Sequence, residues 1–382
     1  MASLNAFSMF SGMGGDSLGL QNAGVHVTVY NEKETFIQGT HEANFQKCTL
    51  MGGSVNGDIT KVTDEEMCKY ANSVDVIFSG FPCQGFSNAG KKKTNDPRNT
   101  LFREFVRATK LLRPNIIIGE NVKGLLSRRT EDGQKYIDVI VNEFRMLGYV
   151  VDYKVCRATD FGVPQKRDRL IIIGVHISAL SSYRVEFPQP ITNVDLSLRN
   201  ILQFNMYGAI RVEPEVYDFT QIPEECILTD MSNHETENHV HPYLRLKAES
   251  RDAEYKGKVF HGLLSFSKRD SPIHCEIVDI RKPSKTIICT YSHQPRLFVP
   301  LRNANGNFLR CLLPDELKQI QGFPRDYFIH GNMRQKIIQI GNAVPPPMIT
   351  HIVSHMMNGS NMVQHTPTPT PEGELHLNTA LP

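Results

Sequence analysis

VDVIFSGFPCQ, residues 74–84, and NIIIGENV, residues 115–122, are the two stretches that decide how this chain folds. Each begins with a continuous apolar run, which is typical of a strand buried on both faces of a sheet. Cys83 follows the first run and Glu120 follows the second. In an open α/β sheet, ligands bind beyond the carboxyl ends of the strands. The two stretches therefore predict a thiol nucleophile and a carboxyl group at the functional edge of such a sheet.

The surrounding residues 4–175 alternate strand-like and helix-like stretches. We expect strands at 6–10, 25–30, 74–79, 115–119, 150–157 and 170–175, and helices at 16–23, 98–112 and 135–147. This order predicts an α/β fold in which a mostly parallel sheet is flanked by helices. From residue 187 to residue 275 the chain is rich in Pro, Asn, His and Glu and shows no dominant periodicity. A smaller, irregular domain of loops and short strands is expected there, followed by helices at 313–321 and within 334–357.

The composition narrows the class of protein. The chain has 382 residues, of which 40% are hydrophobic and 21% are charged, as is ordinary for a globular protein. No run of about 18 apolar residues and no secretory signal pattern is present, so we expect no membrane span and a cytoplasmic or nucleoid-associated location. The eight cysteines form no CxxC pair, which argues against a bound metal and against a disulfide framework. The formal net charge of +2 does not exclude DNA, because basic residues can gather in one cleft.

A glycine-rich turn, FSGMGG at residues 10–15, follows the first expected strand. Such a turn lets a cofactor approach the backbone closely, but it lacks the GxGxxG spacing of dinucleotide binders, which tells against NAD. Glu32, at the end of the second strand, is placed to accept hydrogen bonds from ribose hydroxyl groups. Asp58 is placed to accept one from an adenine amino group. Together they indicate a pocket for an adenosine-containing cofactor.

Five motifs, in this order, resemble those of the DNA (cytosine-5)-methyltransferase family, in particular its compact members from bacterial restriction systems. They are FSGMGG at 10–15, GFPCQGFS at 80–87, ENV at 120–122, QKRDR at 165–169 and QIGNAVP at 339–345. The resemblance spans roughly residues 4–176 and 278–352. It implies the Rossmann-like fold of S-adenosylmethionine-dependent methyltransferases. It also implies S-adenosyl-L-methionine as methyl donor and a cytosine flipped out of double-stranded DNA as acceptor.

The resemblance also implies the roles of individual residues. The Cys83 thiolate would add to C6 of the cytosine, and Glu120 would hydrogen-bond N3 and the exocyclic amine. Arg167 and Arg169 would lie beside the base, with Arg169 at its O2 edge. The residues expected to bind the cofactor are Phe10, Ser11, Gly12, Met13, Gly14, Glu32, Asp58, Ile59, Pro82, Asn342 and Val344.

One residue departs from the family pattern. Related enzymes often carry an aromatic residue just after the acid that corresponds to Glu32, whereas this chain has Lys33 there and contains no tryptophan. We therefore expect the adenine to stack on Phe10 or Ile59. The departure concerns the affinity for the cofactor and not its identity.

The resemblance also divides the chain into segments. Residues 1–180 would form the catalytic and cofactor-binding domain, and residues 181–280 the inserted target-recognition domain. Residues 281–360 would return to the catalytic domain through the C-terminal helix, and residues 361–382 would form a disordered tail. We expect a monomer. The loop 87–97, with lysines at 91–93, is expected either to fold onto the DNA over the extruded base, with its lysines at phosphates, or to be a solvated charged loop.

Two other functions stay open on sequence grounds. The first is RNA cytosine-5 methylation on the same fold, although relatives that act on transfer RNA usually have a second proline where this chain has Phe81. The second is DNA binding without catalysis. Relatives of that kind typically lose the cysteine or the glutamate, and both Cys83 and Glu120 are present here.

Overall fold

A computed structural model describes residues 3–82, 101–236, 249–255, 258–265, 276–292 and 295–358. Cys83, the loop 87–97 and the tail 361–382 lie outside the described residues. Within the described part, none of the helices combines the length and apolar character that a membrane span requires. The same residues contain no group of three or more His, Cys, Asp or Glu side chains that could hold a metal ion.

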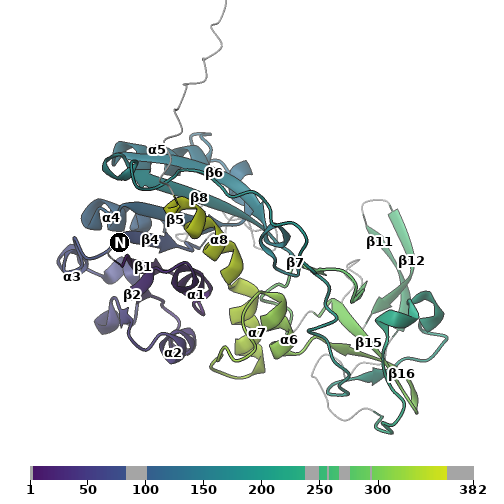
Figure 1. Ribbon diagram of the computed structural model, residues 1–382. Helices are drawn as coiled ribbons and strands as arrows, with labels where there is room; N and C mark the ends of the chain where they lie inside the picture. Colours follow the sequence, from purple (N-terminus) through teal and green to yellow (C-terminus); the bar gives the residue numbers. More distant parts are fainter. Residues whose placement is uncertain are drawn as a thin grey trace, which may run out of the picture.

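A seven-stranded sheet is the centre of the larger part of the molecule, with the order β3-β2-β1-β4-β5-β8-β6 (Figure 1). The strands are β1 (Asn5–Met9), β2 (His26–Asn31), β3 (Thr49–Leu50), β4 (Val76–Ser79), β5 (Ile116–Asn121), β6 (Tyr149–Arg157) and β8 (Asp168–His176). Pairing is parallel from β3 through β5, and antiparallel where β8 joins β5 and β6. The expected mostly parallel α/β sheet is confirmed.

Helices cover both faces of this sheet. They are α1 (Gly15–Asn22), α2 (Thr35–Asn44), α3 (Asp64–Cys68), α4 (Phe102–Leu112), α5 (Tyr136–Met146) and α8 (Pro346–Met357). On β4, Ile77 packs into the core that contains α4 and α5, whereas Val76 and Phe78 pack into the core that contains α1 and α8. Both faces of β4 are therefore buried, which explains the continuous apolar run in its sequence.

The smaller part of the molecule is built on a second sheet with the order β10-β15-β16-β9, and β13 pairs with β15. Its strands are β9 (Ile210–Arg211), β10 (Leu228–Asp230), β13 (Glu276–Ile277), β15 (Leu297–Asn303) and β16 (Gly306–Cys311). The hairpin β15–β16 lies past residue 280, where the sequence placed the end of the smaller domain. It belongs with β9 and β10 because its apolar side chains share their core.

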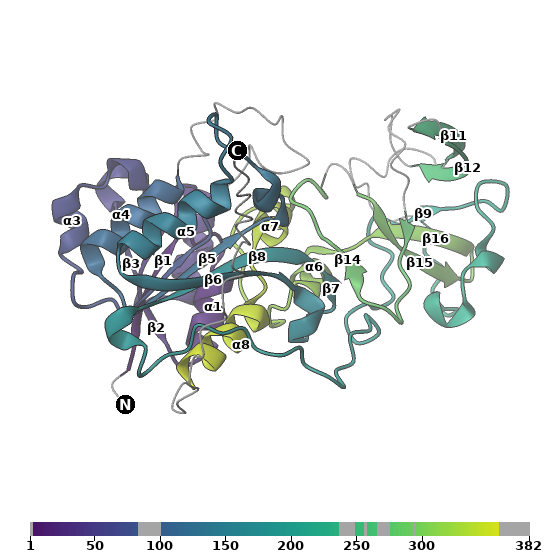
Figure 2. The same cartoon turned by 90° about the horizontal axis from the view of Figure 1, so that it is seen from above.

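Two further strand pairs accompany this sheet. The strands β11 (Glu249–Tyr255) and β12 (Lys258–Ser265) form an antiparallel hairpin. A short parallel pair, β7 (Gln165–Lys166) with β14 (Ser284–Lys285), lies between the two parts of the molecule (Figure 2). This pair joins the segment just before β8 of the large sheet to the segment between β13 and β15 of the small one.

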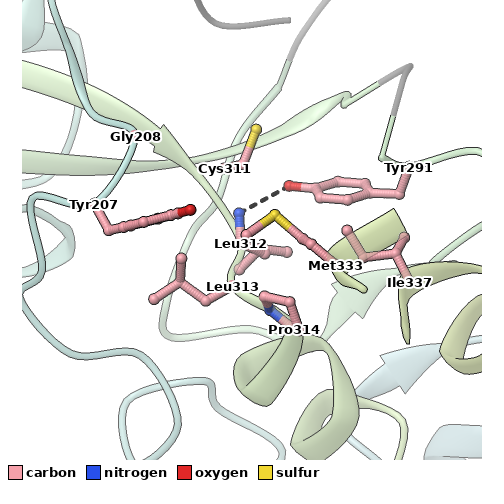
Figure 3. Close-up of a pocket in the computed structure, with 9 residues that line it drawn as sticks. All are labelled: Tyr207, Gly208, Tyr291, Cys311, Leu312, Leu313, Pro314, Met333 and Ile337. Atoms are coloured by element: carbon pink, nitrogen blue, oxygen red, sulfur yellow. Dashed lines mark hydrogen bonds between the residues drawn. The ribbon is translucent and has the colours of Figure 1, made fainter. Parts of the chain in front are cut away.

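The helices α6 (Pro314–Ile320) and α7 (Met333–Asn342) share one apolar core with the second sheet. A small apolar pocket lies between them, where the Tyr291 hydroxyl accepts a hydrogen bond of 2.9 Å from the Leu312 amide (Figure 3). None of the expected site residues lines this pocket. The sequence predicts α6, and also α8 after the prolines at 345–347, but it does not predict α7.

Candidate active site

The turn after β1 has an unusual backbone that the sequence makes possible. Phe10, Gly12 and Gly14 all have positive φ angles, of 53°, 55° and 86°. A Cβ atom on Gly14 would lie 2.4 Å from the ring of Phe45, so a larger residue does not fit there. A Cβ atom on Gly12 would meet no atom within 4 Å. The turn is therefore packed tightly at Gly14 and open at Gly12, where a ligand can reach the backbone.

Glu32 closes one side of this turn from the end of β2. Its Oε2 accepts a hydrogen bond of 3.0 Å from the Gly12 amide, and its Oε1 accepts from the amides of Lys33 and Glu34. Burial raises the pKa of this carboxyl group, against the effect of these hydrogen bonds. Because each carboxylate oxygen can accept two hydrogen bonds, Oε2 keeps the capacity to accept one from a hydroxyl group.

Asp58 and Lys33 form an ion pair of 2.9 Å across the same region. The hydrogen bond from Lys33, followed by that from Thr60, holds the pKa of Asp58 below its usual value. Asp58 also caps the short helical turn that begins at Ile59. Lys33, the residue that departs from the family pattern, thus connects the two acids expected to bind the cofactor.

The other residues expected at the cofactor pocket differ in exposure. Ile59 and Met13 are only 3% and 1% exposed and pack in the cores, whereas Phe10 is half-buried. Of the two expected stacking residues, Phe10 therefore offers more surface. Ser11 and Val344 are buried and Asn342 is exposed. A Cβ atom on Gly15 would lie 2.1 Å from the Val344 carbonyl oxygen, so the 342–344 segment packs directly against the turn.

The ends of β4 and β5 lie beside this turn. The two strands pair in parallel with Ser79 opposite Gly119, so the residues that follow each strand are neighbours. A Cβ atom on Gly80 would lie 3.5 Å from the Phe10 carbonyl oxygen and 4.0 Å from Oε2 of Glu120. The glycine-rich turn, the segment that leads to Cys83 and the expected acid therefore converge on Gly80.

Glu120 is paired with Arg169. Nε of Arg169 lies 2.7 Å from Oε1 of Glu120, and the two side chains are 13% and 12% exposed. The pairing follows from the antiparallel register of β5 and β8, which sets Asn121 opposite Leu170. Such a bond fixes the carboxyl group beneath the segment that leads to Cys83. Two of the residues expected to be catalytic thus meet in the structure.

Arg167 lies deeper than Arg169. Its side chain is 1% exposed, and its terminal nitrogens donate to the carbonyl oxygens of Ile287, Gly341 and Ala343 at 3.0 to 3.1 Å. Burial, followed by the charge of Arg169, lowers the pKa of its guanidinium group. In this structure Arg167 therefore holds the backbone at residue 287 and the segment 341–343 together behind the site.

The described part of the chain reaches Phe81 and Pro82, and Cys83 comes next in the sequence. Nδ2 of Asn121 donates a hydrogen bond of 3.1 Å to the Phe81 carbonyl oxygen. The residue after the acid therefore anchors the backbone two positions before the cysteine. Pro82 is half-buried at the same place.

Two buried polar residues behind the site were not identified from the sequence. Asp16 lies in the first turn of α1, where burial raises the pKa of its carboxyl group to about 7. It accepts a hydrogen bond from the Ser8 hydroxyl, and the charge of Glu120 raises its pKa further. Gln321 is 0% exposed just after α6. A polar residue next to a helix is usually exposed, so neither position carries a sequence signal of burial.

Comparison with known proteins identifies the family. The family model described as C-5 cytosine-specific DNA methylase matches residues 4–358.

The chain belongs to the C-5 cytosine-specific DNA methylase family.

Individual relatives agree with this assignment. The type II methyltransferase M1.HphI of Haemophilus parahaemolyticus is 32% identical, over 90% of this chain and 84% of its own length. The type II methyltransferase M.Eco47II of Escherichia coli is also 32% identical, over 88% and 75%. A prophage-encoded protein of Escherichia coli, whose crystal structure is described as that of a DNA modification methyltransferase, shares the fold. Its TM-score is 0.56 at 22% identity, over 93% of this chain and 99% of that one.

Family membership favours one of the functions left open by the sequence. This DNA methylase is an enzyme that methylates carbon 5 of cytosine in DNA, and the RNA alternative has less support. The resemblance seen in the motifs is thereby confirmed across the whole matched range.

Proposed function

We propose that this C-5 cytosine-specific DNA methylase acts on one base of a specific double-stranded DNA site, with S-adenosyl-L-methionine as donor. The observation that supports this most is the convergence on Gly80. The turn at Phe10, the segment that leads to Cys83 and the carboxyl group of Glu120 all meet there. A donor, a nucleophile and an acid must come together within a few ångströms for this reaction.

The residues around the turn fit the proposed donor. The open backbone at Gly12 gives room for its close approach, and Glu32 keeps acceptor capacity for a ribose hydroxyl group. Asp58, held by Lys33, is the acceptor proposed for the adenine amino group. When bound, the donor supplies a methyl group activated by a positively charged sulfur.

Cys83 is the proposed nucleophile. Carbon 5 of cytosine is too weak a nucleophile to take up a methyl group unaided, and addition of the Cys83 thiolate to C6 makes it enamine-like. The electron pair that C5 gains would form the new bond to the methyl group, while the bond between that methyl group and the donor sulfur breaks and leaves its electron pair on the sulfur. Loss of the C5 proton to a base then restores the double bond and expels the thiolate, so that Cys83 is regenerated.

Glu120 and Arg169 are the proposed partners of the base. Glu120 would hydrogen-bond N3 and the exocyclic amine, which relieves the charge that builds on the ring as the thiolate adds. Arg169 fixes the Glu120 carboxyl group through the 2.7 Å contact, and its Nη1 donates to the Asp168 carbonyl oxygen, so Nη2 is the nitrogen proposed for the O2 edge. Arg167 would support both from behind, through the carbonyl groups that it holds.

The relatives named type II methyltransferases support methylation at a specific DNA site. We also propose that the protein works as a monomer in the cytoplasm or at the nucleoid. Carbon 5 of a stacked base cannot be reached, so we propose that the target cytosine rotates out of the helix. The smaller domain, proposed at residues 181–280 with the adjoining β15–β16 hairpin, would read the site.

Bisulfite sequencing of DNA from a host that expresses the chain tests this proposal, because it reports activity and target site together. We expect a short sequence that is methylated throughout, and no methylation with Cys83→Ser. The Cys83→Ser variant should still bind S-adenosyl-L-homocysteine in calorimetry. Cys68→Ser is the matched control, since Cys68 is an exposed cysteine on α3, and it should methylate normally.

The Glu120→Gln variant tests the role of the acid separately from that of the nucleophile Cys83. We expect a rate that is about 10²- to 10⁴-fold slower, with unchanged binding of S-adenosyl-L-homocysteine. Methylation that persists in Cys83→Ser would exclude covalent attack by this residue. A full rate in Glu120→Gln would exclude the proposed acid.

A further inference from the structure

The segment Gly341–Val344, at the end of α7, is where the two halves of the site meet. Val344 contacts the turn on the donor side, because its carbonyl oxygen lies against Gly15. Arg167, from the side of the base, donates to the carbonyl oxygens of Gly341 and Ala343. One four-residue segment therefore touches both the proposed donor pocket and the support of Arg169.

Close packing leaves this segment little freedom. A Cβ atom on Gly341 would lie 2.3 Å from the Cys289 amide nitrogen, so the end of α7 lies directly on the backbone at residues 288–289. Packing of backbone against backbone transmits small displacements, because protein interiors are close-packed. A shift of this segment would therefore displace groups both at the proposed donor pocket and at the support of Arg169.

Gln321 also holds the segment Gly341–Val344 in place, through hydrogen bonds of its side chain. Its side-chain NH₂ group donates to the Ala343 carbonyl oxygen, which also accepts from Arg167. Its side-chain oxygen accepts from the amide of Gln165, whose own oxygen accepts from the Ile287 amide. Both glutamines are 0% exposed. The amide of Gln321 therefore joins the Ala343 carbonyl group to Gln165, at the start of the segment 165–169 that carries Arg167 and Arg169.

We propose that Gln321 is a positioning residue for the methylation reaction, which holds the donor pocket and the base pocket in register through the carbonyl group of Ala343. The inference rests on the proposed function, because it takes the Gly12 side as the donor pocket and the Glu120 side as the base pocket. Gln321 touches neither ligand. It acts through Val344 on one side and through Gln165 and Arg167 on the other.

Gln321→Met tests the proposal, because methionine keeps the length of the side chain and loses both hydrogen bonds. Gln339→Met is a closely matched control. Gln339 is 1% exposed, accepts one hydrogen bond from Thr40 and donates one to the His330 carbonyl group, away from Ala343. Both variants should lose a similar amount of thermal stability. A difference between them in binding or catalysis therefore cannot come from the loss of stability alone.

The first measurement is the affinity for S-adenosyl-L-homocysteine by calorimetry, without DNA. We expect the dissociation constant to rise about tenfold in Gln321→Met and less than twofold in Gln339→Met, as for one buried hydrogen bond. The second is kcat on unmethylated genomic DNA at saturating donor, expected to fall about tenfold in Gln321→Met alone. Equal changes in the two variants would overturn the proposal.

A further variant covers the case in which Gln321→Met does not fold. In Gln321→Glu, a protonated carboxyl group can still donate to Ala343, and an ionised one cannot. We expect its affinity for S-adenosyl-L-homocysteine to weaken as the pH rises from 6 to 9, relative to wild type, and parallel pH profiles contradict the proposal. Wild-type protein that binds the probe but methylates nothing contradicts the proposed function and leaves the binding comparison decisive.

Discussion

Asp16 provides the sharpest test of the electrostatics behind the site. This carboxyl group is fully buried, and burial raises its pKa from the ordinary value of 3.8 to about 7. The folded protein therefore holds a proton on Asp16 that the unfolded chain releases above pH 4. Asp16→Asn replaces the carboxyl group by a neutral group of the same shape, which still accepts the hydrogen bond from Ser8.

The sign and size of the effect follow from linkage. Because the pKa is raised in the folded state, the stability contributed by Asp16 is present below pH 3.8 and is lost as the pH rises to about 7. At 1.36 kcal/mol per pH unit, the loss is about 4 kcal/mol in all, of which about 3 kcal/mol falls between pH 5 and pH 8. Asp16→Asn should therefore become more stable than wild type as the pH rises.

Urea unfolding of both proteins at pH 5, 6, 7 and 8 measures this difference. With a slope of about 2–3 kcal/mol per molar urea, the midpoint of the variant should gain about 1 M on wild type between pH 5 and pH 8. Comparing the two proteins cancels carboxyl groups such as Asp58, whose pKa is lowered and whose effect has the opposite sign. If the two midpoints run parallel with pH, Asp16 does not carry a buried proton and the reasoning fails.

Three further substitutions probe the site. Gly15→Ala would place a methyl group against the Val344 carbonyl group and should cost about 1–3 kcal/mol in urea unfolding, whereas Gly53→Ala, with open space around it, should not. Arg167→Met removes the Arg167 donor from the carbonyl groups of Ile287 and Gly341, whereas Ala343 keeps its hydrogen bond from Gln321, and it should cost about 3–5 kcal/mol, with a much smaller change for the exposed Arg157→Met; similar losses would refute the support role. Asn121→Leu frees the Phe81 carbonyl group and should slow methylation about tenfold while calorimetry shows unchanged S-adenosyl-L-homocysteine binding; a weakened affinity would contradict this.

The strands that carry the site could be predicted because a strand buried on both faces of a sheet has a continuous apolar sequence. Val76–Phe78 and Ile116–Gly119 are apolar without interruption, and the expected functional residues follow within a few positions. The pairing of Glu120 with Arg169 depends on the register between β5 and β8, which are about fifty residues apart in sequence. No local pattern encodes such a register, so the sequence placed both residues at the site without predicting their contact.

The smaller sheet was harder to predict for a different reason. The strand β9 has only two residues. No local pattern in the stretch 297–311 indicates that its second strand, β16, pairs with the distant β9. The burial of Gln321 and Arg167 also arises only when segments far apart in the chain meet. A sequence pattern indicates which residues of one helix or strand share a face, whereas these contacts form only when distant segments of the chain pack together.

The position of β5 bears on which of the two molecules, the enzyme or the DNA, changes shape when they bind. This strand is hydrogen-bonded along both edges, to β4 and to β8, and the carboxyl group that it carries is anchored in the middle of the widest sheet. A group mounted so firmly cannot advance into a stacked double helix. The proposed rotation of the cytosine out of the helix therefore assigns the large deformation to the DNA and not to the sheet.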